Sequence, residues 1–523
     1  MTHRMFVAFA GGGAKALIHL GALRALEAKG VDFRGLSGTS AGALVATLKA
    51  SGFSADELLN PLDKSSVISR LGEIRPSIKQ AKHLFGRWGW WKVWLFRTAM
   101  PMLPTILCVS LVSVALTLIL VGALLAWGRI YLAAAIFAAL IIFLGCVATS
   151  LLSGLARSRE FSEALGILLQ QRMFPSETGR VVRMGDFGRD GRPILKIVSA
   201  NLTTGKMELF SPERTPNVPV ADAVAASISL PIIFEPLIID ENLHMDGGIV
   251  SNLPAWSFDE ERELDPDAIT LAIEIQTATE RRILNRLNWM GAFIQTGLFG
   301  SSELNLRAAG QAERLELSTS LHLLEFDLSI DRAIKEVLDA ETAATAKLDK
   351  WLFQTPETYA EACRFTKGLV DDVIEAALDQ RNPKVRVAIA IPDVGHTRSL
   401  RLRYSTGYEG HHDERMLIPI DGTVAGQAWK TGDSWFELAP LSPEFSLMAP
   451  EHRLRRKALR SDLKWVLCIP ISIGDGPVRF VVQIDGGRDL PEDETVGTMI
   501  NSIETDVKEF FGMLADRFKE MEE

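Results

Sequence analysis

RMFVAFAGGGAKALIHLGALRALEAKG, residues 4–30, is the stretch that decides the fold of the N-terminal part of this chain. Its first seven residues are typical of a buried strand, and a helical pattern follows the glycines until Gly30 ends it. A strand, a glycine turn and a helix together point backbone N–H groups at one spot, where the helix N-terminus also favours an anion. The order predicts an α/β domain with an anion-binding loop at Gly11–Lys15.

A second short strand, containing Leu36, leads into Gly38-Thr39-Ser40-Ala41-Gly42, and a second helical pattern follows. G-x-S-x-G is the pattern of a nucleophile elbow, in which small neighbours allow a strained turn that exposes the serine hydroxyl. The motif alone is moderately specific, and its place just after a glycine-rich loop makes it more so. Ser40 is therefore the candidate nucleophile, and an ordinary helix N-cap is its alternative role.

The candidate base is a carboxylate. None of the nine histidines lies in a context typical of a catalytic triad, and His244 is better explained as a local hydrogen-bonding residue than as a catalyst. Asp246 is followed by Gly247 and Gly248, whose small size lets its carboxylate approach another backbone closely. A plain turn residue is the alternative role for Asp246.

These motifs resemble those of the patatin-like phospholipase family. The resemblance covers roughly residues 4–63 and 161–352, and three further stretches support the motifs: Ser199–Gly205, Ala225–Pro236 and Ser251–Pro254. It implies a three-layer α/β/α hydrolase domain with a Ser40–Asp246 dyad, no metal and no cofactor. Ser40 would form an acyl-enzyme, and Asp246 would take its proton and later activate water. A free aspartate has a pKa of about 3.9 and is therefore a poor base for a serine. The dyad requires a pocket without water, in which burial raises the pKa of the carboxyl group.

The resemblance also implies supporting roles for the residues around the dyad. The oxyanion hole would be formed by the backbone of Gly11, Gly12, Gly13 and Ala14, and the site would be supported by Lys15, Gly38, Gly42, Gly247 and Gly248. Lys15 would support the loop or face a lipid phosphate. The sequence departs from the family at two places: Ala16 stands where glycine is usual, and Lys15 stands where arginine is commoner, which weakens a bidentate phosphate contact.

A nucleotide-binding alternative exists for the same loop. Gly11-x-Gly13-x-x-Ala16 matches the dinucleotide fingerprint G-x-G-x-x-A, and Asp32 lies near the position of a ribose-binding acid. The presence of both Ser40 and Asp246 favours the hydrolase.

An apolar segment interrupts the hydrolase domain. The 523 residues have a mean hydropathy of +0.14, high for a chain with 23% charged residues. From Thr98 to Ala156 the only charged residue is Arg129. Residues 103–127 and 130–155 each reach the length of about 20 residues that a bilayer requires. The sequence predicts a two-helix transmembrane hairpin that turns at Gly128-Arg129, with a buried helical pair as the alternative.

The flanks of this segment predict its orientation. They carry Arg87, Lys92, Arg97, Arg157 and Arg159. By the positive-inside rule, both chain ends and the catalytic domain lie on the cytoplasmic side. The tryptophans of residues 87–97 predict an interfacial collar, with an acyl-chain contact as the alternative.

The composition argues against a nucleic-acid-binding protein and against a zinc- or disulfide-stabilised one. With 56 basic and 65 acidic residues the net charge is −9, which argues against nucleic acid as a partner. Four cysteines without a CxxC pair predict neither a zinc site nor a disulfide framework.

The C-terminal part predicts a separate α+β domain. Helical patterns at 357–380 and 492–520 flank five or six strands, among them 385–392, 465–473 and 478–485. Gly422–Trp429 and the hairpin that begins near Cys468 resemble a GAF domain, a weaker resemblance than the patatin one. This domain would bind a small molecule as a sensor, or would mediate homo-oligomer formation or binding of a partner protein. A purely structural role is the third alternative.

The expected organisation has four parts: residues 1–64 (patatin-like, first part), 65–159 (interfacial segment and hairpin), 160–355 (patatin-like, second part) and 356–523 (GAF-like, with flanking helices). The expected function is a membrane-anchored phospholipase A-type acyl hydrolase, with membrane phospholipids as both substrate and anchor and a regulatory C-terminal domain. The alternatives are a neutral-lipid or thioester hydrolase, and an inert membrane receptor that uses its C-terminal domain as a sensor.

Overall fold

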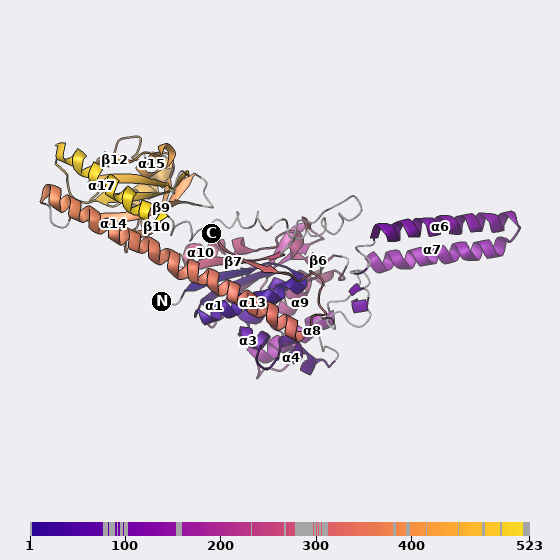
Figure 1. The fold of residues 1–523 in the computed structure, drawn as a ribbon. Helices are drawn as coiled ribbons and strands as arrows, with labels where there is room; N and C mark the ends of the chain where they lie inside the picture. The colour runs from indigo at the N-terminus through magenta and orange to yellow at the C-terminus, as the bar shows by residue number, and fades with distance from the viewer. Residues whose placement is uncertain are drawn as a thin grey trace. The chain divides into compact units, whose positions relative to one another are not determined.

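The structure, a computed structural model, describes residues 3–76, 103–152, 159–231, 233–265, 268–277, 312–379, 383–393, 398–414, 416–447, 449–472, 476–491 and 494–515, together with residues 82, 89–91, 93–94, 98, 296–297, 300, 302 and 305. The chain divides into two units, Met1–Thr345 and Ala346–Glu523 (Figure 1). Of the residues expected to flank the membrane segment, Arg87, Lys92, Arg97 and Arg157 lie outside the described residues.

An eight-stranded mixed sheet forms the centre of the first unit, with the spatial order β5-β6-β3-β2-β1-β7-β8 and β4 paired to β3. Its parallel part consists of β1 (Arg4–Phe9), β2 (Asp32–Thr39), β3 (Ile194–Asn201), β7 (Ile269–Thr277) and β8 (Ala312–Thr319). Its antiparallel edge consists of β4 (Lys206–Phe210), β5 (Leu237–Ile239) and β6 (Asn242–Asp246). The mixed α/β class expected from the sequence is confirmed.

Helices cover the two faces of this sheet. The longer helices of this unit are α1 (His19–Ala28), α2 (Ala41–Ala50), α4 (Val67–Ile74), α8 (Arg159–Met173), α9 (Val220–Ser227) and α13 (Ile330–Asp349). Shorter ones are η1 (Gly13–Ile18), α3 (Ala55–Leu58), η4 (Met184–Asp186), η5 (Gly247–Ile249), η6 (Ala255–Phe258) and α10 (Asp259–Leu264).

Side-chain alternation along β1 explains the layers. Phe6 stacks on Phe258 of η6, with ring centroids 4.9 Å apart, on one face of the sheet. Phe9, three residues later, points to the other face and meets the ring of His19 in α1, 5.2 Å away. Gly21 of α1 then lies against α13, because a Cβ atom there would come within 2.4 Å of the Val337 carbonyl oxygen.

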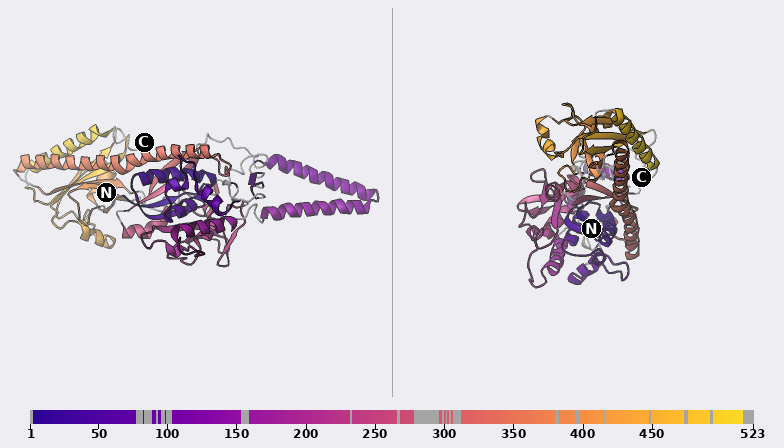
Figure 2. Two further views of the ribbon diagram at one scale, coloured as in Figure 1. Left: turned by 90° about the horizontal axis from the view of Figure 1, so that it is seen from below. Right: turned by 90° about the vertical axis from the view of Figure 1, so that its left-hand side faces the viewer.

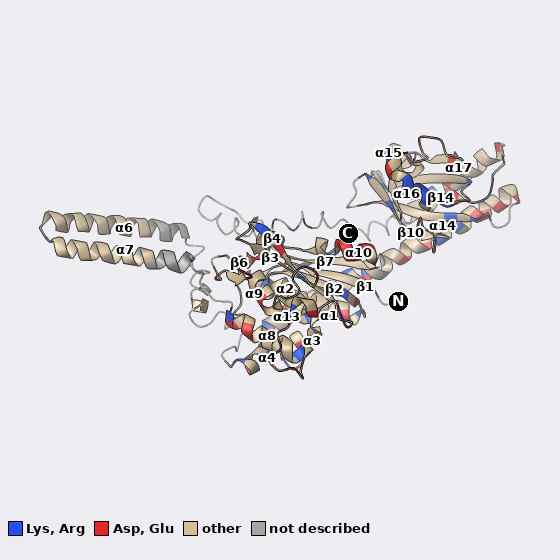
Figure 3. Ribbon diagram, turned by 180° about the vertical axis from the view of Figure 1, so that it is seen from behind, with Lys and Arg blue, Asp and Glu red and all other residues tan. Residues whose placement is uncertain are grey.

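Two apolar helices, α6 (Leu103–Ala126) and α7 (Ile130–Leu152), lie side by side and are joined by a turn at Gly128 (Figures 1 and 2). Their described lengths carry no Lys, Arg, Asp or Glu (Figure 3). Among the described residues, Val109–Ala126 is long and apolar enough to cross a membrane, and none of this window is buried. Ile130–Phe143 of α7 is apolar but shorter. The structure thus offers one helix that meets the length criterion for a span.

The second unit contains a six-stranded antiparallel sheet with the order β11-β10-β9-β14-β13-β12. Its strands are β9 (Val385–Pro392), β10 (Ser399–Thr406), β11 (Leu417–Pro419), β12 (Trp435–Leu438), β13 (Trp465–Ser472) and β14 (Val478–Gly486). Its helices are α14 (Thr355–Leu378), which follows the π-helical turn η7 (Lys350–Gln354), α15 (Val424–Thr431), η8 (Pro450–His452), α16 (Arg453–Ala458) and α17 (Glu494–Met513). One core lies between the sheet and α14 and α17, and a second lies under α15.

Candidate active site

Ser40 occupies the strained turn between β2 and α2. Its φ of 55° and ψ of −132° are unusual for a residue with a side chain, and the glycines beside it explain how the turn is made. A Cβ atom on Gly38 would lie 2.4 Å from the Gly42 carbonyl carbon, and one on Gly42 would lie 2.5 Å from the Phe9 carbonyl oxygen. The two glycines therefore let α2 start directly against β1 and β2, which holds Ser40 at the C-terminal ends of these strands.

The glycine loop follows β1 at the same end of the sheet. Gly13 has a φ of +54°, and a Cβ atom there would come within 2.4 Å of the Leu323 carbonyl oxygen. The N–H of Gly11 donates to the Asn252 carbonyl at 3.1 Å, and the N–H of Ala14 donates to the Leu323 carbonyl at 2.9 Å. The N–H groups of Gly12 and Gly13 are left without an acceptor among the described residues. Of the four expected oxyanion donors, only these two are therefore free to bind a substrate oxygen.

Asp246 reaches the site from the antiparallel edge of the sheet. It ends β6, where it pairs with Ser199 of β3. The Gly248 N–H donates to its Oδ1 at 2.7 Å, and its own N–H donates to the Ser229 carbonyl at 2.9 Å. A Cβ atom on Gly247 would lie 2.3 Å from the Val198 carbonyl oxygen. The glycines after Asp246 thus let the turn pack directly on β3.

The Ser40 hydroxyl donates to Oδ2 of Asp246 at 2.6 Å. Both groups are almost enclosed, with 5% of Ser40 and 1% of Asp246 exposed. Burial raises the pKa of Asp246 to about 7, although the hydrogen bonds from Ser40 and Gly248 act in the opposite direction. A carboxylate with this pKa is a far better base near neutral pH than a free aspartate.

Ser227, at the end of α9, completes the support of the elbow. Its hydroxyl accepts the Ser40 N–H at 2.9 Å and donates to the Val198 carbonyl at 2.6 Å. Sequence reasoning placed the surrounding Ala225–Pro236 stretch near the site but did not single out this serine. Nothing in the local pattern distinguishes Ser227 from Ser229, which follows α9 and whose hydroxyl donates to the Ala225 carbonyl of that helix.

Three other polar residues near the site are buried. The His19 ring donates from Nε2 to the Ala10 carbonyl at 2.8 Å, and burial lowers the pKa of His19 to about 4, which keeps the ring neutral. Lys15 is also buried. The His244 ring contacts Phe210, and burial lowers its pKa. Among the described residues, no group of three or more His, Cys, Asp or Glu side chains is arranged to hold a metal.

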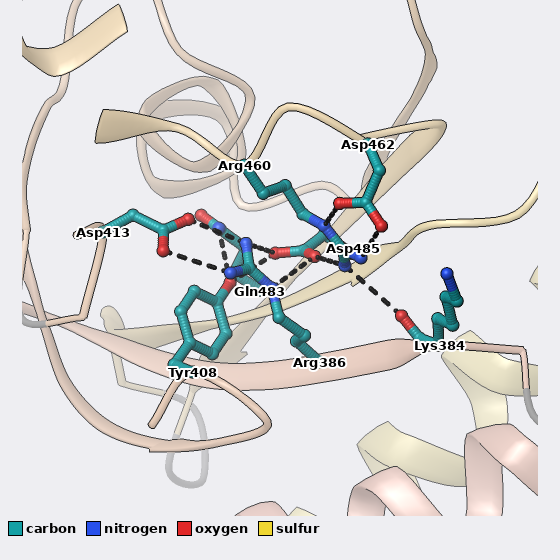
Figure 4. A network of polar contacts seen from close by, with 8 residues as sticks. All are labelled: Lys384, Arg386, Tyr408, Asp413, Arg460, Asp462, Gln483 and Asp485. Carbon is teal, nitrogen blue, oxygen red and sulfur yellow. Dashed lines mark hydrogen bonds and ion pairs between the residues drawn. The ribbon is translucent and has the colours of Figure 1, made fainter. Parts of the chain in front are cut away.

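The second unit holds a separate buried polar network (Figure 4). Arg386 lies between Asp485, whose oxygens accept its hydrogen bonds at 2.8 and 3.0 Å, and Asp413, whose oxygens accept at 3.1 and 2.7 Å. Asp485 also accepts from Tyr408 and Arg460. Burial opposes the charge on Arg386, but the two carboxylates outweigh it and raise the pKa of this guanidinium.

A pocket opens beside this network. Its polar lining is Arg386, Asp413, Thr423, Arg460, Gln483 and Asp485, and the rest is apolar, including Leu402, Ile418, Phe445 and Leu463. Because every charged member of the network already has opposite charges around it, the pocket offers a ligand mainly apolar contact.

Residues 7–259 match the family model described as patatin-like phospholipase. Among curated proteins, the uncharacterized protein YqhO of Bacillus subtilis is 25% identical over 301 residues, which cover 55% of this chain and 78% of that protein. The probable lipid hydrolase 463L of Invertebrate iridescent virus 6 is 29% identical over 86 residues, and these cover 16% of this chain and 30% of that protein.

Solved structures are similar to each part. VipD from Legionella pneumophila is 16% identical with a TM-score of 0.33, and the match covers 73% of this chain and 78% of VipD. The C-terminal part is similar to GAF domains, including that of A. Aeolicus nlh2, which is 16% identical with a TM-score of 0.21 over 33% of this chain and 98% of that domain. By its match to the family model, and on that ground alone, the chain contains a patatin-like phospholipase domain at residues 7–259.

Proposed function

We propose that this chain is a membrane-anchored lipid acyl hydrolase of the phospholipase A type, which cleaves ester-linked acyl chains of glycerophospholipids. The observation that carries this proposal is the 2.6 Å hydrogen bond from Ser40 to the enclosed carboxylate of Asp246 in a patatin-like domain. The match to the family supports lipid hydrolysis, and so does the relative named a probable lipid hydrolase.

In the first step, ionised Asp246 takes the proton of Ser40 Oγ while this oxygen attacks the ester carbonyl carbon. The N–H groups of Gly12 and Gly13 stabilise the negative charge that forms on the carbonyl oxygen. When the tetrahedral intermediate collapses, the bond to the glycerol oxygen breaks and that oxygen takes the proton from Asp246. The lysophospholipid leaves, and the acyl chain stays on Ser40.

In the second step, Asp246 removes a proton from water as the water oxygen attacks the acyl-enzyme. The second intermediate collapses by breaking the bond to Ser40 Oγ, which recovers a proton from Asp246. The free fatty acid leaves, and both residues return to their starting states. Asp246 alternates between base and acid twice in one turnover, which suits a carboxyl group with a pKa of about 7.

The hairpin of α6 and α7 is the proposed anchor. The exposed apolar window Val109–Ala126 supports one span. The second span, through α7, is part of the proposal and rests on the absence of charged residues from Ile130–Leu152. Two spans would keep both chain ends on one side, and the basic residues that flank the hairpin in the sequence favour the cytoplasmic side. An anchored enzyme needs no separate membrane-binding step to meet its substrate.

The second unit is the proposed regulator of the hydrolase. A phospholipase held permanently on a membrane would degrade that membrane unless its activity were controlled. The pocket beside the Arg386–Asp485 network is the proposed place for a small regulatory ligand.

The test is product analysis with the purified full chain in nanodiscs. Phosphatidylcholine, phosphatidylethanolamine, phosphatidylglycerol, triacylglycerol and a long-chain acyl thioester are offered separately, and products are identified by mass spectrometry. Release of fatty acid and lysophospholipid by the wild type, but not by Ser40→Ala, supports the proposal. Turnover confined to triacylglycerol or thioester would favour the neutral-lipid or thioester hydrolase. No turnover by a folded chain would favour an inert receptor.

A further inference from the structure

His19, the first residue of α1, is a buried titratable side chain that the proposed mechanism does not use. It is 0% exposed, and its ring donates from Nε2 to the Ala10 carbonyl at 2.8 Å. Because a carbonyl oxygen can only accept, the proton of the neutral ring must lie on Nε2, and Nδ1 must be the bare nitrogen. Nδ1 has no hydrogen-bond partner among the described residues. The polar character of this side chain is therefore used in a single contact.

Packing alone does not explain a histidine at this place. The ring meets that of Phe9 edge-on, at an angle of 73° between the two planes. An apolar side chain could make the same contact without enclosing a nitrogen atom that lacks a partner. Burial lowers the pKa of His19 to about 4, so the ring also carries no charge near neutral pH. What the imidazole adds to the fold is the donor that it presents to Ala10.

The Ala10 carbonyl is enclosed next to the nucleophile elbow. Ala10 continues β1, is 1% exposed, and donates its own N–H to the Ile273 carbonyl of β7 at 3.0 Å. A Cβ atom on Gly42 would lie 2.6 Å from the Ala10 carbonyl oxygen, so the first turn of α2 packs directly against this carbonyl. A buried carbonyl without a donor costs free energy comparable to a lost hydrogen bond. His19 supplies the donor at this position.

The peptide group between Ala10 and Gly11 is held at both of its edges. His19 donates to its carbonyl, and its N–H, which belongs to Gly11, donates to the Asn252 carbonyl at 3.1 Å. Because a peptide group is planar, two bonds on opposite edges fix its orientation. This group is the one that enters the glycine loop.

The next peptide groups of the loop carry the two proposed oxyanion donors. The Gly12 carbonyl accepts the Lys15 N–H at 3.1 Å, which fixes the peptide group that carries the Gly13 N–H. The Ala14 N–H donates to the Leu323 carbonyl at 2.9 Å. The peptide group that carries the Gly12 N–H therefore lies between two groups that are held. Both donors are aimed by the bonds of their neighbours.

The bond from His19 differs from the other contacts that hold the loop. The others join backbone groups, whereas this one comes from a side chain. It also joins residues nine positions apart, and so closes a ring of chain, residues 10–19, that contains Gly12 and Gly13. Without this donor the Ala10 carbonyl can turn, and the following peptide groups turn with it.

We propose that His19 is a positioning residue for the oxyanion hole: its imidazole holds the Ala10 carbonyl, and through it aims the Gly12 N–H at the oxygen of the tetrahedral intermediate. This inference rests on the proposed ester hydrolysis by Ser40 and Asp246. His19 acts through the backbone and transfers no proton in the reaction.

The first experiment compares substitutions that differ in one donor. Glutamine places an N–H group near the position of Nε2, methionine has a similar length without a donor, and phenylalanine keeps a ring without a donor. The full-length protein hydrolyses p-nitrophenyl acetate in detergent micelles. Because a misaimed donor stabilises the oxyanion poorly, His19→Met and His19→Phe lower kcat/KM by about 10- to 100-fold. His19→Gln restores at least about fivefold of this loss.

The second measurement separates the oxyanion from the rest of the site. In the thiono analogue of the substrate, sulfur replaces the carbonyl oxygen, and sulfur is a weak hydrogen-bond acceptor. The thiono ester therefore gains little from the N–H groups of Gly12 and Gly13. The oxygen-to-sulfur ratio of kcat/KM falls by about tenfold in His19→Met and His19→Phe, and stays within about threefold of the wild-type ratio in His19→Gln.

Lys196→Met is the matched control for loss of stability. It removes the donor from another buried backbone carbonyl, that of Ser257 at 2.8 Å, together with an ion pair to Glu261. Ser257 belongs to η6, which covers the opposite face of the sheet from His19. The control keeps the wild-type oxygen-to-sulfur ratio even where urea unfolding shows it to be less stable.

Two results overturn the inference. One is a wild-type oxygen-to-sulfur ratio in either donor-free variant, with circular dichroism showing that variant folded. The other is equal activity of His19→Gln and the donor-free variants. Both results leave the Ser40–Asp246 dyad intact. Wild type that fails to hydrolyse p-nitrophenyl acetate in micelles and in nanodiscs removes the proposed function, and this inference with it.

Discussion

The Ser40 hydroxyl and the Asp246 carboxylate lie 2.6 Å apart although their positions in the sequence differ by 206. The intervening chain contains α6 and α7, so both ends of this apolar insertion return to the same sheet. Ser40 directly follows β2, which is parallel to β3, and Asp246 ends β6, which is antiparallel to β3. Strand β3 lies between β2 and β6 in the sheet. The hydrogen bond between the two proposed catalytic residues therefore depends on the sheet forming across the insertion.

The rate of ester hydrolysis should follow the protonation state of the Asp246 carboxyl group. Burial raises the pKa of this carboxyl from its ordinary value to about 7, so the group is protonated and unable to accept the Ser40 proton below that pH. We expect kcat/KM for a soluble ester to rise about tenfold per pH unit below 7 and to level off above it. A profile that is flat from pH 5 to 8 would show that Asp246 is not the base.

The same pKa shift predicts an effect on stability. Between about pH 4 and 7 the folded chain keeps the Asp246 proton while the unfolded chain has lost it, so the free energy of unfolding falls as pH rises through this range. Asp246→Asn removes this contribution. We expect urea unfolding to show the wild type less stable than the variant above pH 7, with the difference shrinking toward pH 4. A difference independent of pH would contradict this assignment.

Substitution of Gly42 by alanine should damage the elbow. The new methyl group would lie 2.5 Å from the Phe9 carbonyl oxygen and 2.6 Å from that of Ala10, and both are backbone atoms. We expect a loss of about 1–3 kcal/mol in unfolding free energy, with a larger proportional loss of ester turnover. Gly166→Ala is the matched control, since its methyl group meets only the Ala221 Cβ at 3.7 Å and a helical glycine is replaced. The control should be neutral or slightly stabilising.

Ser227→Ala should slow catalysis without removing a reacting group. The substitution leaves the buried Ser40 N–H without its acceptor, a cost of about 1–3 kcal/mol that corresponds to about a 10- to 100-fold loss in kcat/KM. Ser229→Ala, which removes only the hydrogen bond from the Ser229 hydroxyl to the Ala225 carbonyl of α9, should cost far less. Equal losses from both substitutions would mean that the bond to Ser40 has no special part in catalysis.

Asp485→Asn should destabilise the second unit. It weakens the hydrogen bonds from Arg386, Arg460 and Tyr408 and leaves buried positive charge poorly compensated, at a cost of about 3–5 kcal/mol. Asp462→Asn tests an exposed partner of Arg460, with 48% of its side chain accessible, and should cost about 0–1 kcal/mol. Urea unfolding of the full chain measures both. Similar losses in the two variants would contradict a structural role for the buried network.

Local patterns in the sequence predicted much of this fold. The alternation in VRVAIAIP marked β9 at Val385–Pro392, and the glycines around Ser40 and after Asp246 marked two turns whose close packing explains them. These features depend on residues near one another in the chain. The sequence therefore predicted that both members of the proposed dyad lie on turns, and the resemblance to a known family predicted that they act as a pair.

Contacts between distant backbone segments could not be predicted in the same way. The Ala14 N–H bonds to the Leu323 carbonyl and the Gly11 N–H to the Asn252 carbonyl, so two expected oxyanion donors are engaged. A backbone carbonyl carries no sequence signature, because every residue has one.

The most direct test of the central claim is reaction of the full-length protein with a fluorophosphonate in nanodiscs, followed by peptide mass spectrometry. The account predicts one modified serine, Ser40, with labelling abolished in Ser40→Ala and slowed at least about 100-fold in Asp246→Asn, while circular dichroism shows both variants folded. Undiminished labelling of folded Ser40→Ala at another serine, or equal labelling rates for wild type and Asp246→Asn, would contradict a Ser40–Asp246 dyad.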